Sequence, residues 1–340
     1  TYSIGIEALP NYAEQIEGPC ITMVHSEDVV VTVRWADNNN QDGQRPEELT
    51  LRLLADKLDA GRTATLAGES EADTWVLRMD KVPVWSMVNT GREIDYTYLL
   101  DAASASSLEA AGYSVQYNGY ELGEGSEIGG TLLYTLDLSR DAEIADYTAT
   151  VAWDDDTDRD GQRPASLTVE LYADGESTGL TAEVTGGNEA ESWSHVFEAL
   201  PVHADQGNVI VYTLALVGDT PSGYTVVPDQ TKPAMELKHE ISRTDVTATV
   251  TWDHKSDING LEPIDLYVEL TVDGVATGEV AKLTAANNWS YTWPGRYVYH
   301  DHGTAYEYSF IVSEQSLSQL PDGVEVVVDG TEGTVIHSTF

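Results

Sequence analysis

Apolar and polar residues alternate along the chain in many short segments, which turn residues separate roughly every 8–12 positions. In Tyr147–Trp153, for example, tyrosine, alanine, valine and tryptophan are each separated by a threonine or an alanine. A period of two places successive side chains on opposite faces of a strand, and β-branched and aromatic residues favour strands. One alanine- and serine-rich segment, Ala102–Ala111, departs from the alternation and predicts a short helical turn in a loop. The pattern therefore predicts an all-β fold of short antiparallel strands.

One plan of strands and turns occurs three times in the sequence. Each copy opens with an alternating strand that ends in tryptophan, has a glycine eight residues later, and carries a second tryptophan 37–40 residues after the first. About seven strands in roughly 100 residues are typical of an immunoglobulin-like β-sandwich, so we expect a tandem array of such sandwiches. Buried aromatic rings fill the space between two sheets, and this is the role expected for the strand-ending residues Trp35, Trp153 and Trp252.

The repeats set the expected domain boundaries. Repeat 1 is expected at residues 28–139, repeat 2 at 146–241 and repeat 3 at 244–340. Residues 1–27 fit the plan as the last two strands of a partial preceding repeat. Thr1–Ile6 resembles Glu307–Val312, and Ile21–Ser26 resembles Thr334–Ser338. Two strands alone are marginal in water, so these residues are expected to pair within the chain, to complete a sandwich in another chain, or to be a fragment end.

The balance of charge excludes several classes of partner. Lys and Arg number 17 against 58 Asp and Glu, which gives a formal net charge of −41. This sign argues against nucleic-acid binding and against docking on anionic lipid. The 8 Trp and 18 Tyr are too many for a disordered acidic tail. No apolar run reaches the roughly 18 residues of a membrane span, and the single cysteine, Cys20, excludes an intrachain disulfide.

The loop sequences resemble the Cna protein B-type (CnaB) domain. Five pieces carry the resemblance: Trp35–Pro46, Trp153–Pro164, Leu171–Gly175, Gly223–Thr225 and Asn287–Tyr291. The resemblance implies immunoglobulin-like CnaB sandwiches from the stalks of Gram-positive adhesins and pilins. There such domains act as rigid spacers between the cell wall and a binding tip, which implies an extracellular place on the cell surface or cell wall.

The resemblance also implies an internal isopeptide bond that this sequence lacks the residues to form. Many CnaB domains join a first-strand lysine to a last-strand asparagine with the help of a buried acid. Apolar residues occupy the matching lysine positions, Val33, Val151 and Val250, and the matching acid positions, Leu100, Leu216 and Val312. The closing strands contain no asparagine. We therefore expect no isopeptide bond and sandwiches held by ordinary apolar cores.

The loop of repeat 2 contains alternating carboxylates. Asp156, Asp158 and Asp160 precede Gly161, which matches the first half of a calcium-binding loop. The glutamate that would complete an EF-hand is absent, because Leu167 stands at the twelfth position. The alternative is a solvated turn rich in Asp and Asn. The two expectations for this loop are therefore a bound calcium ion or no cofactor.

Other candidate chemistry is sparse. His300 and His302 form an H-x-H pair that could hold a transition metal, against the alternative of an exposed loop. No nucleophile elbow, zinc-protease, phosphate-loop or dinucleotide motif occurs, so no enzyme activity is expected. Four aromatic residues could stack on a sugar or pack between repeats: Trp85, Trp293, Tyr297 and Tyr299.

These observations predict a non-enzymatic structural stalk or spacer of a bacterial extracellular surface protein or filament. Its expected partners are neighbouring repeats and other copies of the chain, and strong like-charge repulsion would keep it soluble. Two alternatives stay open at this point. The first is an adhesin that recognises a glycan or a host protein, and the second is an accessory region of a large secreted enzyme.

Overall fold

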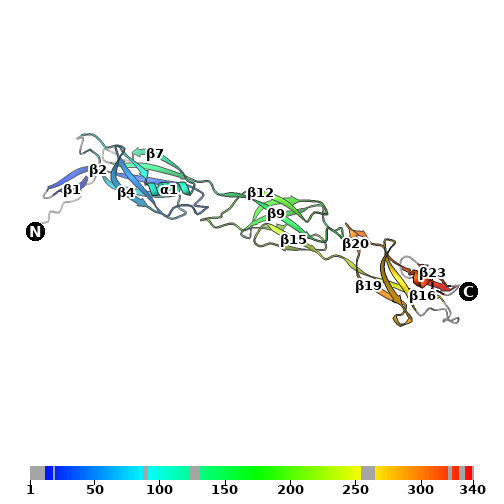
Figure 1. Ribbon diagram of the computed structural model, residues 1–340. Helices are drawn as coiled ribbons and strands as arrows, with labels where there is room; N and C mark the ends of the chain where they lie inside the picture. The colour runs from blue at the N-terminus through cyan, green and yellow to red at the C-terminus, as the bar shows by residue number, and fades with distance from the viewer. Residues whose placement is uncertain are drawn as a thin grey trace. The chain divides into compact units, whose positions relative to one another are not determined.

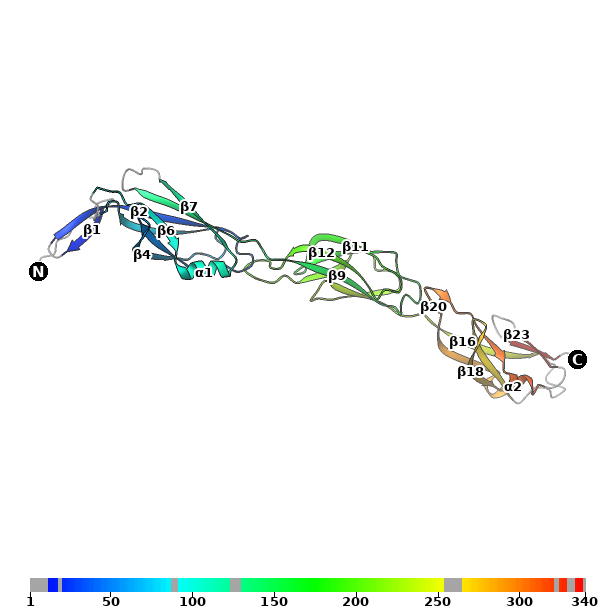
Figure 2. The ribbon, with the colours of Figure 1, turned by 45° about the horizontal axis from the view of Figure 1, so that its top comes forward.

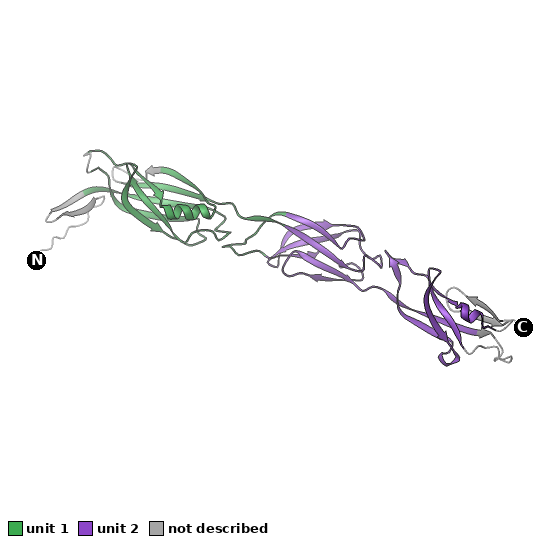
Figure 3. Ribbon diagram, in the orientation of Figure 1, with its two compact units in different colours: residues 1–146, 198–210 green, residues 147–197, 211–340 purple. Residues whose placement is uncertain are grey.

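The structure is a computed structural model that describes residues 12–17, 20–86, 91–122, 130–253, 265–320, 324–328 and 334–338 of the 340-residue chain. It separates into two compact units (Figure 3). Unit 1 comprises Thr1–Asp146 with Glu198–Ile210, and unit 2 comprises Tyr147–Phe197 with Val211–Phe340. The two units do not coincide with the three expected repeats. Glu198–Ile210 of repeat 2 groups with repeat 1, and the rest of repeat 2 groups with repeat 3.

Unit 1 is built from two sheets in which nearly all neighbouring strands are antiparallel (Figure 1). The exception is the parallel pair β2–β8, in which Asp28–Ala36 lies beside Thr131–Ser139. One sheet has, in order, β5 (Thr74–Pro83), β2 (Cys20–Ala36), β8 (Thr131–Ser139) and β7 (Ser114–Leu122). In the same sheet, β1 (Tyr12–Glu17) pairs with the first part of β2. The other sheet has β4 (Leu58–Leu66), β3 (Leu49–Ala55) and β6 (Tyr96–Leu100).

The first described residues of unit 1 form two paired strands. Cys20–His25 of β2 pairs antiparallel with Tyr12–Glu17, and β2 continues without a break as the first strand of repeat 1. The expected strand Ile21–Ser26 is therefore present within β2. The other expected strand, Thr1–Ile6, lies outside the described residues.

The core of unit 1 follows the alternation of the sequence. Val29, Val31 and Val33 of β2 are fully buried against the alternating leucines of β3. Trp35 closes this core and meets the rings of Trp75 and Tyr113 edge-on, with centroids 4.9 and 5.4 Å away. Apolar burial of this extent is the main term that stabilises a sandwich.

The predicted helical turn is confirmed as α1, which spans Ala102–Ala110 and follows β6 (Figures 1 and 2). Asp101 caps it by accepting a hydrogen bond from the backbone N–H of Ser104 at 2.7 Å. The Ser104 hydroxyl in turn accepts from the N–H of Thr50 at 2.8 Å, which ties the helix to β3. None of the described helices is long and apolar enough to cross a membrane.

Unit 2 repeats the same two-sheet plan twice. Each sandwich again contains one parallel pair, β9–β15 and β16–β24, between otherwise antiparallel neighbours. In the first sandwich, one sheet has β12 (Ser192–Pro201), β9 (Ile144–Asp154), β15 (Ala234–His239) and β14 (Tyr224–Pro228), and the other has β11 (Glu176–Val184), β10 (Leu167–Ala173) and β13 (Tyr212–Leu216). In the second sandwich, one sheet has β19 (Ser290–Tyr297), β16 (Arg243–Asp253), β24 (Thr334–Ser338) and β23 (Val324–Val328), and the other has β18 (Val275–Leu283), β17 (Leu266–Val272) and β22 (Tyr308–Val312).

The two sandwiches of unit 2 have their own cores. In repeat 2, Trp153 is 9% exposed and meets Trp193 and Tyr224 edge-on at 4.8 and 5.3 Å, the arrangement seen around Trp35. The core of repeat 3 is formed by leucine, valine and aromatic residues of its own strands. The side chain of Trp252 lies outside the described residues. The prediction of an all-β fold of tandem antiparallel sandwiches is confirmed.

Candidate functional site

A buried charge cluster holds the loop that follows β9. Arg163 donates two hydrogen bonds to Asp155, from Nε to Oδ2 and from Nη2 to Oδ1, both at 2.7 Å. The Tyr224 hydroxyl donates to Asp155 Oδ2 at 2.7 Å, and the guanidinium lies 4.9 Å from the centre of the Trp153 ring. Both charged side chains are only 1% exposed. Such a pair is costly to break, since either partner alone would be an uncompensated buried charge.

The same cluster occurs in repeat 1. Arg45 donates from Nε and Nη2 to Asp37 at 2.7 and 2.6 Å, and the Tyr113 hydroxyl donates to Asp37 at 2.6 Å. Burial alone would raise the pKa of both aspartates, Asp37 and Asp155, but the hydrogen bonds from arginine and tyrosine outweigh it and hold each pKa below its ordinary value. Both carboxylates are therefore charged at neutral pH.

The three carboxylates of the predicted calcium loop point to different partners. Asp156 accepts from Arg159 Nε at 2.6 Å, and Asp158 Oδ1 accepts from the backbone N–H of Arg163 at 3.0 Å. Asp160 Oδ2 accepts from the N–H of Ser242 at 2.8 Å. Across the described part of the chain there is no group of three or more His, Cys, Asp or Glu side chains that could hold a metal ion. Calcium binding stays a prediction without support from this geometry.

The backbone explains the run of aspartates in another way. Asp156, Thr157 and Asp158 have φ of 52°, 64° and 56°, and the matching Asn38–Asn40 of repeat 1 has φ of 52–61°. This left-handed conformation is disfavoured for most residues and best tolerated by Asn and Asp. The loop is therefore a left-handed turn, which favours the alternative interpretation of the sequence as a turn rich in Asp and Asn.

A melting experiment tests the calcium prediction. A specific site should raise the melting temperature more with calcium than with sodium at matched ionic strength, and Asp158→Ala should remove the difference. Screening of a net charge of −41 would act equally through both salts. Equal shifts in the unmodified protein would contradict a specific site.

The histidine pair also has separate partners. His300 Nδ1 lies 2.6 Å from Asp301, whereas His302 Nδ1 lies 3.8 Å from Asp158 Oδ2. Two rings with separate carboxylates do not converge on one ion. The transition-metal alternative therefore gains no support from the geometry.

Two of the four aromatic residues considered for sugar stacking pack inside unit 2. Trp293 is buried in the core of repeat 3. The ring of Tyr297 has two guanidiniums over it, that of Arg159 at 4.3 Å and that of Arg243 at 4.1 Å from the ring centre. Cation–π contacts with an arginine of repeat 2 and with one at the start of β16 favour packing between repeats 2 and 3 for this ring.

The positions that would carry an isopeptide bond are part of the apolar core. Val33 and Val151 are fully buried, and Val250 is nearly so. The lysines that the structure describes are all exposed: Lys57, Lys81, Lys232, Lys238 and Lys282. The absence of the bond is tested by intact mass, because each Lys–Asn cross-link would remove one ammonia. We expect the full sequence mass, and a deficit traced to a Lys–Asn peptide would refute this.

Sequence reasoning missed a second acidic contact that recurs in both units. Asp42 in unit 1 accepts from the backbone N–H of Glu143 at 2.9 Å and from Arg140, and in unit 2 Asp160 is bound in the same way by Ser242 and His239. A signal was available in the sequence. Each aspartate lies seven residues after the strand tryptophan of its own repeat. Each cationic residue lies 13 residues before the strand tryptophan of the following repeat.

The protonation of His239 follows from its partners. Its Nε2 lies 2.9 Å from Asp160 Oδ2 and its Nδ1 lies 2.8 Å from the Gly223 carbonyl oxygen. Both partners only accept, so both ring nitrogens donate and the ring is an imidazolium. Burial by itself would lower the pKa of His239, but these two hydrogen bonds outweigh burial and raise it above its usual value.

This histidine predicts a pH dependence for unit 2. A pKa that is raised on folding adds stability below the unfolded pKa of about 6.5, and that stability is lost as pH rises through the folded pKa. The loss of stability caused by His239→Gln, measured by urea unfolding, should therefore be largest near pH 6 and shrink toward pH 9. His239→Arg should remove the pH dependence. A His239→Gln effect that is constant over this range would contradict a charged ring.

Comparison with known proteins agrees with the fold and the loops described above. The model of the Cna protein B-type domain matches residues 29–122, 147–237 and 246–339. A collagen adhesin of Staphylococcus aureus is 30% identical over 300 residues, which cover 86% of this chain and 23% of that protein. This chain thus spans less than a quarter of that relative's length.

Solved structures from the same organism are also similar. The crystal structure of two B repeat units of the S. aureus collagen-binding protein is 26% identical, covers 98% of this chain and 81% of that chain, and has a TM-score of 0.46. A single B repeat unit of that protein is 30% identical, covers 58% of this chain and 100% of that chain, and has a TM-score of 0.27. The resemblance inferred from the loops is confirmed, and this chain belongs to the Cna protein B-type domain family, with three tandem matches to it.

Proposed function

We propose that this chain is a non-enzymatic structural spacer of a bacterial extracellular surface protein. The observation that carries the proposal is the tandem arrangement of one sandwich plan, matched three times by one family model. Each described core is filled by apolar side chains, and the buried carboxylates Asp37 and Asp155 are each paired with an arginine. An array of this kind supplies length and stiffness without a catalytic site. The place proposed for it is the cell surface or cell wall, as part of a stalk or filament.

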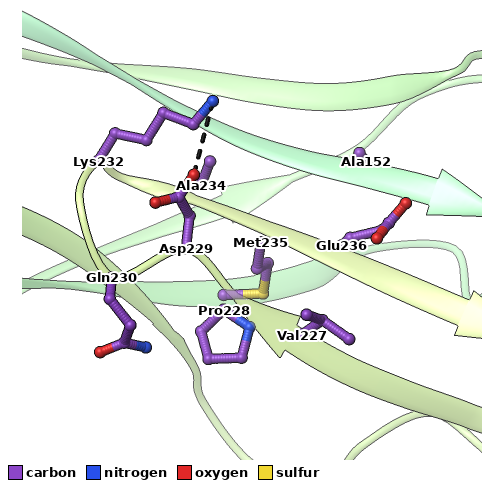
Figure 4. Close-up of a pocket in the computed structure, with 9 residues that line it drawn as sticks. All are labelled: Ala152, Val227, Pro228, Asp229, Gln230, Lys232, Ala234, Met235 and Glu236. Carbon is purple, nitrogen blue, oxygen red and sulfur yellow. Dashed lines mark ion pairs between the residues drawn. The ribbon is translucent and has the colours of Figure 1, made fainter.

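A ligand-binding adhesin is the alternative, and the name of the collagen adhesin relative raises it. One hollow in the described part of unit 2 measures about 480 Å3 and lies beside the turn between β14 and β15 (Figure 4). The ion pair Lys232–Asp229, 3.6 Å long, lies at this turn. No aromatic residue is among the nine that line the hollow, so it offers no ring on which a sugar could stack. This favours the spacer.

A binding assay separates the two functions. The whole chain, immobilised at equal density beside an unrelated protein of similar negative charge, is exposed to a glycan array and to fibrillar collagen. A spacer should bind no more than the charge-matched control at physiological salt. Saturable binding that exceeds this control would refute the spacer proposal and favour an adhesin.

A further inference from the structure

One aspartate in each unit forms the same contact with a linker strand. In unit 2, the side chain of Asp160 is 2% exposed, and its Oδ2 accepts from the N–H of Ser242 and from His239. Ser242 lies in the segment that connects β15 to β16 and so leads into repeat 3, and His239 is the last residue of β15. Asp160 itself belongs to repeat 2. One buried carboxylate therefore joins the loop of a repeat to the strand that starts the next.

The corresponding carboxylate in unit 1 is Asp42. Its Oδ2 accepts from the N–H of Glu143 and from Arg140, and its Oδ1 lies 3.2 Å from His203 Nδ1. Glu143 and Ser242 both lie ten residues before a strand tryptophan. The donors thus occupy equivalent positions in the two units, although one cation is arginine and the other is histidine.

Next to each aspartate, a glycine touches the tip of a hairpin. In unit 2 the tip belongs to the hairpin of β20 (Tyr299–Asp301) and β21 (Thr304–Ala305), and the N–H of Gly303 donates to the Arg159 carbonyl at 3.0 Å (Figure 2). In unit 1 the tip is the turn closed by the antiparallel bridge His203–Val209, and the N–H of Gly207 in this turn donates to the Gln41 carbonyl at 2.9 Å. The two hairpin tips therefore meet their loops through equivalent backbone hydrogen bonds.

These contacts leave no room for a side chain on the loop glycine. A Cβ on Gly161 would lie 2.7 Å from the nitrogen of Gly303, and one on Gly43 would lie 2.7 Å from the backbone of Gln206. Distances under 3.0 Å do not occur for real Cβ atoms. Backbone packs on backbone at both places, so the fit depends on glycine itself.

The buried arginine cluster gives the loop its shape from within its own repeat. The N–H of Arg163 donates to Asp158 at 3.0 Å, and the N–H of Arg45 donates to Asn40 at 3.0 Å. The left-handed turn is thus held by residues of the repeat that carries it. A surface that is already formed loses little conformational entropy when a partner binds.

We propose that the Asp–Gly loops, Asp42–Gly43 and Asp160–Gly161, are docking surfaces whose partner is the following repeat of the chain. The partner is recognised by a backbone N–H on its linker segment and by a hairpin tip that carries glycine. The cation, His239 or Arg140, lies at the end of the strand before the linker and pairs with the carboxylate from there. This inference rests on the proposed spacer role and names how the spacer's repeats are joined.

The first test replaces the glycine at the contact. Gly161→Ala is compared in the whole chain with Gly179→Ala, because the two glycines have φ of 66° and 71° but nothing lies within 4 Å of a Cβ on Gly179. Both variants bear the same strain of a left-handed alanine. Gly161→Ala should raise the hydrogen-exchange rates of the Ser242 and Gly303 amides about tenfold or more, and Gly179→Ala should not. Equal rates in the two variants would overturn the proposal.

The second test removes the carboxylate. Asp160→Ala should speed exchange at Ser242 and Gly303 while β10 and β17 stay protected, and Asp229→Ala, which removes an equal charge from the same repeat, should change neither amide. Loss of protection throughout β10 would show that Asp160 supports the fold of repeat 2 and would overturn a docking role. This test and the binding assay for the spacer can fail separately. If Asp160→Ala leaves the exchange rates of Ser242 and Gly303 unchanged and the chain binds no ligand, the docking surface alone is refuted. If the variant raises those rates and the chain binds a ligand, the spacer role alone is refuted.

Discussion

Replacing Trp153 with alanine should unfold repeat 2 while repeat 3 stays folded. The ring is nearly buried between the rings of Trp193 and Tyr224 and under the guanidinium of Arg163. Truncating a buried tryptophan removes its apolar contact area and leaves a cavity, at a cost of about 3–5 kcal/mol. That is a large fraction of the stability of one domain of this size. The described core of repeat 3 is made of residues of that repeat, so it should keep its packing.

Hydrogen exchange monitored by mass spectrometry checks this result for each repeat separately. Strand β10 should lose protection and strand β17 should keep it. Leu180→Ala is the matched control, because this side chain is 42% exposed and its truncation should cost less than about 1 kcal/mol. Simultaneous loss of protection in both strands would show that the two sandwiches unfold as one.

Replacing Arg163 with methionine should destabilise repeat 2 almost as strongly. Methionine keeps an apolar stem over Trp153 but leaves Asp155 buried with only the Tyr224 hydroxyl as a side-chain partner. Breaking one side of a buried ion pair costs about 3–5 kcal/mol, whereas removing both charges is often close to neutral. The double variant Arg163→Met with Asp155→Leu should therefore recover part of the lost stability.

The pH dependence of this variant has a definite sign. The pKa of Asp155 is lowered on folding, so its contribution is present above its unfolded value of about 3.9 and is lost as pH falls through the folded pKa. The stability difference between Arg163→Met and the unmodified protein, measured by urea unfolding, should shrink below that pH. The control is Arg296→Met, which breaks the partly exposed pair with Glu279 and should cost no more than about 1 kcal/mol. An equal loss of unfolding free energy in the two variants would contradict the claim that burial makes the Arg163–Asp155 pair costly to break.

Much of the fold could be predicted because the information is local. In β2, Val29, Val31 and Val33 are buried and the residues between them are more exposed, as a period of two requires. The helical turn at Ala102–Ala110 also follows from its own residues and its cap at Asp101. The parallel pairing of β2 with β8 has no such signal, because it joins segments about 100 residues apart.

The loops show the limit of spacing as a guide to chemistry. The alternating aspartates at 156, 158 and 160 match the ligand spacing of a calcium loop. In the folded loop, where residues 156–158 are left-handed, the three side chains have different partners. The spacing of carboxylates along a chain predicts that their side chains meet around one ion only when the backbone conformation of the loop is known. In this loop, Asp and Asn are also the residues that best tolerate that conformation.

The sequence by itself determined the strands, the threefold repeat and the family, because alternation, turn residues and recurring tryptophans act over short distances. Only the tertiary structure decided what the loop aspartates do. Asp155 meets Tyr224 across 69 positions, and Asp160 meets His239 across 79. A carboxylate takes its partners from whatever donors the fold brings within hydrogen-bond distance, and no local pattern specifies donors that lie so far along the chain.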